Sequence, residues 1–286
     1  MSIANFIPAV WSAQVMTALE KSLVFGSPMV VNRDYEGEIQ GQGDRVKINM
    51  ISDPTISDYV KNTDIATAEV LNDAQSELII DKGKTFNFQV DDVDAVQTKP
   101  KVMGVALQRA GYKLRDTIDQ DIAAAMKAAA STVTGLGTDG SPRTDLGTVG
   151  KAYEYLVKFG TALDELNVPA EGRFATVPPW FVEKLKLDNT YLVKATDVGD
   201  DLTRNGKVAR VAGFDLLLSN NVPNVSGTTY TIMAGTNIAT SFAQQIVKTE
   251  AYRPEKRFAD AVKGLAVYGI KVVRPNLLIK LVANRA

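Results

Sequence analysis

The sequence contains neither histidine nor cysteine. Without these residues the chain can form no disulfide, thiol nucleophile or Ser-His pair, and it lacks the commonest general base and a leading zinc ligand. The absence of cysteine also fits a reducing compartment. Most classes of enzyme are therefore disfavoured, and we predict no catalytic residue, no cofactor and no metal site.

The chain also lacks an excess of charge of either sign, because 32 Lys and Arg residues stand against 33 Asp and Glu residues. No overall positive field attracts nucleic acid or anionic lipid. No apolar run is long enough to span a bilayer, and the first charged residues, Glu20 and Lys21, do not form a basic leader. We therefore expect a cytosolic product with no membrane partner.

A long helical pattern runs from Pro100 to Ala130. Its apolar side chains recur three or four residues apart, which places them on one face of an α-helix. On the opposite face, Lys113 with Asp116 and Arg115 with Asp119 have the spacing of weak ion pairs. At 1.5 Å per residue such a helix is on the order of 45 Å long, so we predict a spine for the fold. Its apolar face comprises Met103, Leu107, Ala110, Leu114, Ile118, Ile122, Ala125, Met126 and Ala129.

Two segments before this helix, Arg45–Met50 and Thr85–Val90, alternate polar and apolar residues with the period of half-buried strands. The segment from Ser52 to Ser76 is polar, so we predict a long antiparallel hairpin with an irregular tip. A two-stranded hairpin is marginal alone in water. It is therefore either a sheet edge folded onto its own domain or an arm that reaches a neighbouring subunit. An amphipathic helix carrying Trp11 is predicted from Pro8 to Phe25.

After the spine the pattern changes to shorter elements. A second amphipathic helix is predicted from Val149 to Leu166, where it could pack against the spine. Gly135–Gly140 spells G-x-G-x-x-G but follows a helix, so we interpret it as a loop and not as a dinucleotide site. A separate α+β lobe is predicted from strands Phe174–Val177, Phe214–Leu218 and Thr228–Met233 and helices Trp180–Leu187 and Ile238–Val247. Gly264–Ala283 is predicted to be a buried strand pair that turns near Pro275.

The order of these elements resembles the major capsid proteins of tailed bacteriophages, which have the HK97-like fold. The segments that carry the resemblance are Val31–Gly37, Gly43–Ile48, Val177–Phe181 and Tyr268–Pro275. The resemblance implies an α+β protein with five parts: an N-terminal arm (1–33), an extended β-hairpin loop (34–90), a peripheral domain with the long spine helix (91–170), an axial α+β lobe (171–250) and a C-terminal return strand into the peripheral domain (251–286). It does not by itself imply a covalent cross-link or a cleaved pro-segment, and we predict neither.

Such a protein assembles with itself, as hexamers and pentamers, into an icosahedral shell around double-stranded DNA that it does not read by sequence. The resemblance further implies a portal protein, scaffolding or decoration proteins where the shell uses them, assembly in the cytoplasm of a host bacterium, and a final place in the virion capsid. A shell subunit needs contacts that close into rings and no catalytic group, which agrees with the composition. The residues predicted to make intersubunit contacts are Trp11, Arg33, Asp34, Glu36, Arg45, Lys47, Lys61, Lys82 and Lys84.

Two other functions stay open from the sequence. One is a non-viral nanocompartment of the same fold that encloses an enzyme as cargo, which the contents of purified particles would distinguish. The other is a cytosolic enzyme that uses carboxylates, Lys or Tyr. Its only tight acidic group beside the spine is Asp91, Asp92 and Asp94, whose plainer role is to provide negative charge near the start of the helix.

Overall fold

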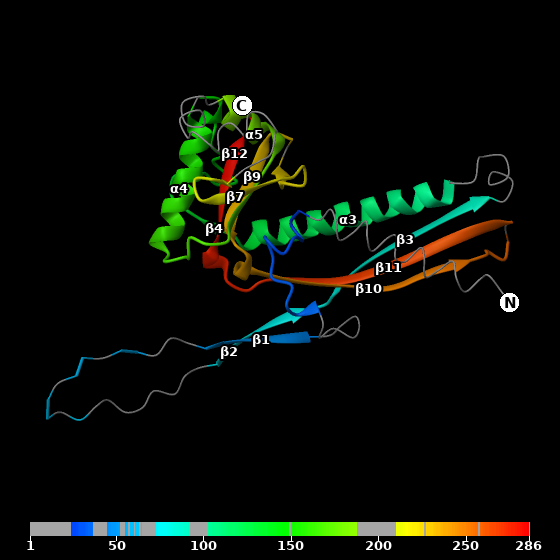
Figure 1. The fold of residues 1–286 in the computed structure, drawn as a ribbon, viewed down its shortest axis with the longest axis horizontal. Coiled ribbons are helices and arrows are strands. Elements are labelled where there is room, and N and C mark those ends of the chain that lie inside the picture. Colours follow the sequence, from blue (N-terminus) through cyan, green and yellow to red (C-terminus); the bar gives the residue numbers. More distant parts are fainter. Residues whose placement is uncertain are drawn as a thin grey trace.

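A computed structural model of the chain describes residues 24–36, 45–51, 55–56, 58–59, 61–62, 64, 73–91, 102–148, 150–187, 210–225, 227–256 and 258–285. Figure 1 shows an elongated molecule with a rounded lobe, from which a long helix and a long sheet lead away. A hairpin projects from the other side of this sheet (Figure 1). The predicted helix Pro8–Phe25, except for its last two residues, lies outside the described residues.

The spine is helix α3, Val102–Ala129, which confirms the predicted helix to within two residues at each end. The side chains of Leu107, Leu114, Ile118, Ile122 and Met126 are buried, as predicted. The ion pair of Lys113 with Asp116 is present, with 3.6 Å between Nζ and Oδ2. The predicted pair of Arg115 with Asp119 is wrong, because the Asp119 side chain is only 2% exposed and accepts hydrogen bonds inside the protein.

A three-stranded antiparallel sheet lies along α3, in the order β10 (Thr240–Tyr252), β11 (Ala259–Val272), β3 (Lys82–Asp91). Phe242, Val262, Ala266 and Tyr268 of this sheet share one buried cluster with Ile118 and Ile122 of α3. The helix therefore covers one face of the long sheet.

The lobe is built on a second, mixed sheet whose centre is formed by β12 (Leu278–Asn284), β9 (Thr229–Thr236), β5 (Arg173–Val177) and β7 (Phe214–Leu218). Short strands complete it: β4 (Ser131–Thr132) beside β12, β6 (Arg210–Val211) beside β7, and β8 (Asn224–Val225) beside β9. Helices α4 (Lys151–Glu165) and α5 (Pro179–Leu187) share one core with this sheet. Ile232 and Ala234 belong to that core, whereas Met233 between them packs in the α3 core.

The predicted strand Arg45–Met50 is present as β1 (Arg45–Ile51), but its predicted partner is wrong. It pairs antiparallel with β2 (Asp73–Ile79), whereas Thr85–Val90 lies within β3 and pairs with β11. The pattern hid β2 because its sequence is mostly polar, and among residues 76–79, whose side chains the structure describes, Leu78 is the buried one.

The predicted helix Ile238–Val247 is also wrong, because the chain forms a short 3₁₀ turn, η4 (Asn237–Ala239), and then β10. The adjacent residues Phe242 and Ala243 are both buried, one in the α3 core and the other under the hairpin. A strand covered on both faces carries neighbouring apolar residues, and this spacing resembles that of a helix.

The helix predicted over Val149–Leu166 is confirmed as α4, but it packs in the lobe core and not in the core of the spine. The two C-terminal strands are present on either side of Pro275, yet they do not pair with each other. β11 lies in the long sheet and β12 pairs with β9 and β4 in the lobe, with a 3₁₀ turn, η5 (Pro275–Leu277), between them. The chain thus passes from one sheet to the other at this proline.

We predict that Ile118→Asp leaves little soluble, folded protein. Ile118 is 0% exposed in the α3 core, and burying an unpaired carboxylate there costs several kcal/mol against a typical stability of about 5–15 kcal/mol. Gln108→Asp on the exposed side of the same helix is the control and should melt near the wild-type temperature. Soluble yield and thermal melting measure both variants, and a wild-type melting curve for Ile118→Asp would contradict the packing described here.

Candidate intersubunit surfaces

The hairpin of β1 and β2 is fixed to the body at its base. The two strands pair in register from Arg45 opposite Ile79 to Ile51 opposite Asp73. On its outer side Arg45 Nη1 lies 3.3 Å from Glu77 Oε2. The inner side forms a small cluster with β10 and β11, made of Val46, Ile48, Leu78, Ile80, Ala243 and Val267. The base of the hairpin is therefore part of the fold.

Gly269 on β11 allows the hairpin to cross the long sheet at close range. A Cβ atom at this position would lie 2.5 Å from the backbone oxygen of Ile79 and 2.7 Å from Cδ1 of Ile80. Because one of these atoms belongs to the backbone, rotating a side chain cannot relieve the contact. Any other residue at position 269 requires the hairpin or β11 to shift, so Gly269 permits the close approach of the hairpin to the long sheet.

The stretch between β1 and β2 carries exposed apolar side chains. Among its described residues, Ile56 is 94% and Tyr59 is 76% exposed. Figure 1 shows the described parts of this stretch at the far end of the hairpin, away from the body. Apolar side chains on a projecting segment indicate an interaction surface. The hairpin tip is therefore the first candidate for a contact between copies.

A second candidate is the turn that joins β10 and β11 at the opposite end of the molecule, where Phe258 is 84% exposed. The strands that carry this turn are held by an ion pair of Arg253 Nε with Asp260 Oδ1 at 3.2 Å and by hydrogen bonds between Asn87 and the Tyr252 hydroxyl group, the shorter being 3.0 Å. The strands on either side of the turn therefore hold Phe258 in an exposed position.

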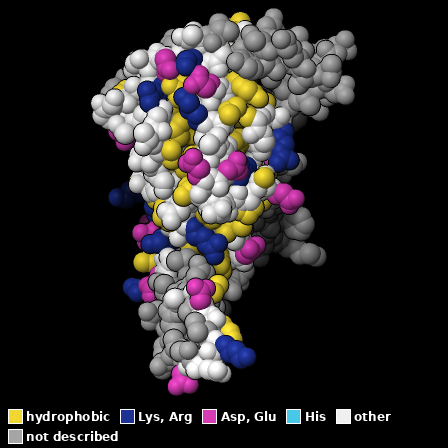
Figure 2. All heavy atoms as spheres, turned by 90° about the vertical axis from the view of Figure 1, so that its left-hand side faces the viewer, with side chains coloured by type: hydrophobic (Ala, Val, Ile, Leu, Met, Phe, Trp, Pro, Cys, Tyr) yellow, Lys and Arg dark blue, Asp and Glu magenta, His cyan; other side chains and the backbone are white. Residues whose placement is uncertain are grey.

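The lobe presents a third surface. Val157 on α4, Leu166 just after it and Leu187 at the end of α5 are exposed. Figure 2 faces the lobe with the hairpin below it and shows acidic and basic side chains interspersed among apolar ones. A surface with both signs of charge lets identical copies meet without strong repulsion.

The contact residues predicted near the N-terminus are partly used within the chain. Arg33 Nη2 lies 2.8 Å from Glu36 Oε1, and the Arg33 guanidinium lies 5.8 Å from the centre of the Phe242 ring. Asp34 between them is exposed. Trp11 lies outside the described residues.

The predicted lysines fall into two groups. Lys47 on β1 and Lys61 in the hairpin tip are exposed, as a role in contacts requires. Lys82 and Lys84 are half-buried on β3, and Lys84 Nζ lies 3.3 Å from Asp121 Oδ2 of α3. Lys84 therefore ties the long sheet to the spine. No contact role has been observed for any of the nine predicted residues, so these roles remain predictions.

Sequence reasoning missed a polar site around Asp119. Asp119 Oδ1 accepts the backbone N–H groups of Val24, Phe25 and Gly26 at 3.1, 2.8 and 3.3 Å, and Oδ2 accepts the side-chain N–H of Asn221 at 3.3 Å. Burial raises the pKa of Asp119 above 3.8, and these hydrogen bonds oppose that rise in part. A signal was present, since position 119 precedes the buried residues Ile122, Ala123 and Met126 by three, four and seven residues and so falls on the buried face.

Two buried tyrosines also bind carboxylates. The Tyr155 hydroxyl group donates to Asp145 Oδ1 at 2.6 Å, and the Tyr268 hydroxyl group donates to Asp121 Oδ2. Burial, followed by the carboxylate partner, raises the pKa of both tyrosines. Each hydroxyl therefore keeps its proton and acts as a structural donor.

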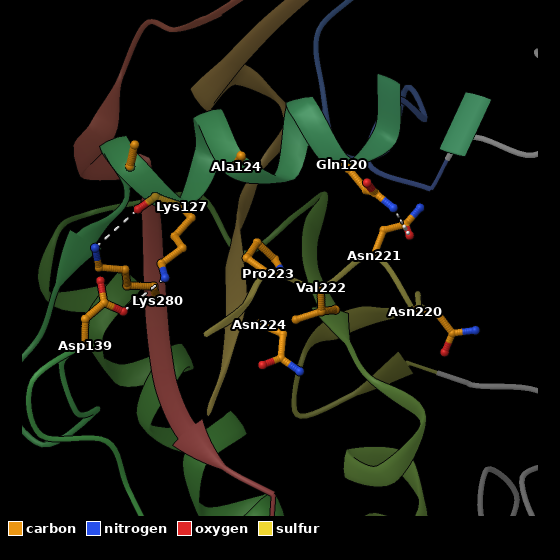
Figure 3. A pocket seen from close by; sticks show the side chains of 11 residues that line it. Gln120, Ala124, Lys127, Asp139, Asn220, Asn221, Val222, Pro223, Asn224 and Lys280 are labelled. Carbon is orange, nitrogen blue, oxygen red and sulfur yellow. Dashed lines mark hydrogen bonds and ion pairs between the residues drawn. The ribbon is translucent and has the colours of Figure 1, made fainter. Parts of the chain in front are cut away.

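A polar cleft of about 540 Å³ lies between α3 and the turn at residues 220–224. Figure 3 shows the side chains that line it. Lys127 Nζ lies 3.2 Å from Asp139 Oδ1, and Lys280 Nζ donates to the backbone oxygen of Lys127 at 3.2 Å. Both ammonium groups already have partners, so the cleft is not suited to binding an anion. It marks the boundary between the lobe and the spine.

The G-x-G-x-x-G segment beside this cleft is a loop, as predicted. Gly137 has a φ of +77°, and a Cβ atom at this position would lie 2.5 Å from the backbone oxygen of Val282. A glycine is therefore required here by a tight turn. Within the described residues no group of three His, Cys, Asp or Glu side chains is placed to hold a metal ion. The helices described here include none long and apolar enough to cross a membrane.

The family model described as "Phage capsid protein" matches residues 75–281, most of the chain. No curated protein sequence matches it. Among solved structures, a chain of Mycobacterium phage Che8 is 27% identical, with 91% of each chain covered and a TM-score of 0.74.

Two further structures share the fold at lower identity. The capsid of cyanophage P-SCSP1u is 19% identical over 93% of this chain and 90% of its own, with a TM-score of 0.72. A virus-like particle from Pyrococcus furiosus is 15% identical over 98% of this chain and 100% of its own, with a TM-score of 0.54. The whole length of these chains is therefore comparable with this one.

We predict that Gly269→Ala destabilises the subunit by about 1–3 kcal/mol, the usual cost of forcing extra atoms into a packed site. Its added methyl group meets a backbone oxygen at 2.5 Å, so β2 has to shift away from β11. Gly140→Ala is a matched control, because a Cβ at 140 has no atom within 4 Å. Thermal or denaturant unfolding measures the difference, and equal stability of the two variants would show that the hairpin is not held against Gly269.

Proposed function

This chain belongs to the phage capsid protein family, and from that premise we propose that its hairpin of β1 and β2 locks neighbouring subunits of a shell together. The chain is a major capsid protein of the tailed-phage type with an HK97-like fold, and copies of it form an icosahedral shell. Its place is in the virion capsid. The proposal concerns which parts of the subunit make that shell cohere.

The observation that carries the proposal is the contrast between the two ends of the hairpin. Its base is buried against β10 and β11, whereas Ile56 and Tyr59 in its tip are largely exposed. The base belongs to the stability of the subunit, and the tip contributes little to it. A second copy is the partner that covers the tip, because shell subunits present the same surfaces to each other in every ring.

We also propose that the packaged material is double-stranded DNA, held without sequence-specific contacts. The near-zero net charge supports contacts without sequence readout, because tight binding of DNA needs many Lys and Arg contacts to phosphates and sequence readout needs further contacts to the bases. Portal, scaffolding and decoration proteins, and assembly in the cytoplasm of a bacterial host, belong to the same proposal. So does the absence of a catalytic role, which the missing His and Cys support.

The division of the chain into parts is likewise a proposal. We assign residues 1–33 to an N-terminal arm and the segment from residue 34 to the end of β2 to an extended loop. The peripheral domain then contains α3, β3, β10 and β11, which share one core. Helix α4 and strand β12 go with the axial lobe, because they pack in its core.

We predict that replacing Ser52–Asn72 by a short Gly-Ser turn leaves a folded subunit that no longer forms shells. The substitution keeps every pair of β1 with β2, from Arg45 opposite Ile79 to Ile51 opposite Asp73. Shortening a loop changes its closure entropy by only about 0.6 kcal/mol per halving. Permanent interfaces bury about 2,000–5,000 Å², and the loss of the tip removes part of that area from every subunit at once. Thermal melting reports the fold and sedimentation reports the assembly.

A Gly-Ser segment of the original length in place of Ser52–Asn72 separates reach from side-chain contacts. If the side chains of the tip carry the contact, this variant also fails to form shells. Full-size particles from the shortened variant would show that shells form without the tip, and failure of this variant to fold would show that the tip belongs to the subunit's own core. Either result would contradict the proposed role.

We predict that purified particles contain double-stranded DNA when they are produced in infected cells. Nuclease treatment of opened particles, followed by gel electrophoresis and protein mass spectrometry, identifies the contents. The alternative of a cargo compartment predicts a second, enclosed protein in fixed ratio to the shell and no DNA. Particles of that second kind would overturn the proposed packaging role while leaving shell formation intact.

A further inference from the structure

One buried carboxylate joins three parts of the subunit that are far apart in the sequence. Asp119 lies near the middle of α3 and is 2% exposed. One of its oxygens binds the chain at residues 24–26, and the other binds Asn221 in the turn after β7. The spine, the N-terminal segment and the lobe therefore meet at this side chain.

On the N-terminal side the carboxylate receives three successive backbone N–H groups. Other contacts hold the same segment: the side chains of Phe25, Val30 and Val31 are buried in the α3 core. Further along, Asn32 exchanges backbone hydrogen bonds with Thr240 and Phe242 at 2.8 and 2.9 Å. Within the described part of the chain, the contact with Asp119 is the first anchor of the N-terminal segment. It fixes where the preceding residues 1–23 join the body.

On the lobe side Asn221 is itself held in place. Its backbone N–H donates to Ser219 Oγ at 3.1 Å, and its side-chain oxygen accepts a hydrogen bond from Gln120 Nε2 at 3.5 Å. Figure 3 shows Gln120 and Asn221 facing each other at one end of the polar cleft. Beyond this contact the spine and the turn at residues 220–224 are separated by the cleft of about 540 Å³. Asp119 and Gln120 therefore join the spine to the lobe at this end of the cleft.

Packing alone would not select a carboxylate here. The neighbouring positions on the same face are Ile118, Ile122 and Ala123, all 0% exposed, and a small apolar residue at 119 would fill the space without the cost of burying a charge. What an apolar residue could not do is accept three backbone N–H groups, which would then be left without a partner. The carboxylate of Asp119 is thus suited to holding the N-terminal segment.

We propose that Asp119 is a positioning residue for shell assembly, which fixes the exit of the N-terminal segment and ties it, through Asn221, to the lobe. The inference rests on the shell-forming function, since it assigns the N-terminal segment to contacts between copies. The attachment of this segment is therefore separable from the folding of the subunit.

The test uses the full-length chain and four variants. Asp119→Ala removes both acceptors, Asp119→Asn keeps one side-chain oxygen, and Asn221→Ala removes only the lobe contact. Gln108→Ala is the control, because Gln108 lies on the exposed side of the same helix, away from this network. Hydrogen exchange at residues 24–26 in the unassembled subunit reports the anchor, melting reports the fold, and sedimentation reports the shells.

For Asp119→Ala we expect exchange at residues 24–26 to accelerate at least tenfold, with the long sheet still protected and the yield of shells reduced at least tenfold. Asp119→Asn should fall between this variant and the wild type, and Asn221→Ala should leave residues 24–26 protected. Gln108→Ala should match the wild type in all three measurements.

Wild-type exchange at residues 24–26 in Asp119→Ala, or a wild-type yield of shells despite fast exchange, would overturn the proposal. If Asp119→Ala does not fold, Asp119→Asn decides by the same two readouts: faster exchange with fewer shells supports the proposal, and wild-type values for both contradict it. A wild-type chain that formed no shells would contradict the proposed function instead, and the exchange at residues 24–26 would still test the anchor.

Discussion

The apolar face of α3 packs against both sheets at once, and the arrangement of the molecule depends on this shared core. Ile118, Ile122 and Met126 lie in one cluster with Phe242 and Tyr268 of the long sheet. The same cluster contains Phe174, Met233 and Leu278 of the lobe. One helix therefore supplies a common surface for both sheets and fixes how they lie relative to each other.

Elements outside this core project from the body, and they are the ones suited to assembly. The hairpin tip and the turn after β10 expose Ile56, Tyr59 and Phe258, each on a support that is fixed to the core by buried side chains or ion pairs. Exposed apolar groups of this kind stabilise the subunit little, and they contribute when a second copy covers them. The exposed residues proposed for assembly are therefore largely different from the buried residues that stabilise the subunit.

The sequence predicted the helices with a clear apolar stripe and several strands of the lobe, but it missed strand β2 and predicted a helix where β10 lies. The helices α3 and α4 each show a clean stripe, so their bounds came out within two residues. β10 is buried on both faces near Phe242 and reads as a helix, while β2 is mostly polar and reads as a loop. Strand pairing failed at Pro275 because register depends on distant partners. The anchor at Asp119 was hidden for a similar reason, since its partners lie more than ninety residues away.

A closed shell requires that each contact be made in a fixed direction, because the same contact closes a ring at one angle and gives an open helix at another. Long-range charge cannot supply that direction here, since the net charge is −1 and both signs are mixed on the face seen in Figure 2. Direction has to come from rigid geometry. The hairpin meets this requirement: Val46, Ile48 and Leu78 bury its base, and the backbone of Ile79 lies so close to Gly269 that there is no room for a Cβ atom. A glycine on β11 thus permits the close packing that gives the base of the hairpin a fixed direction.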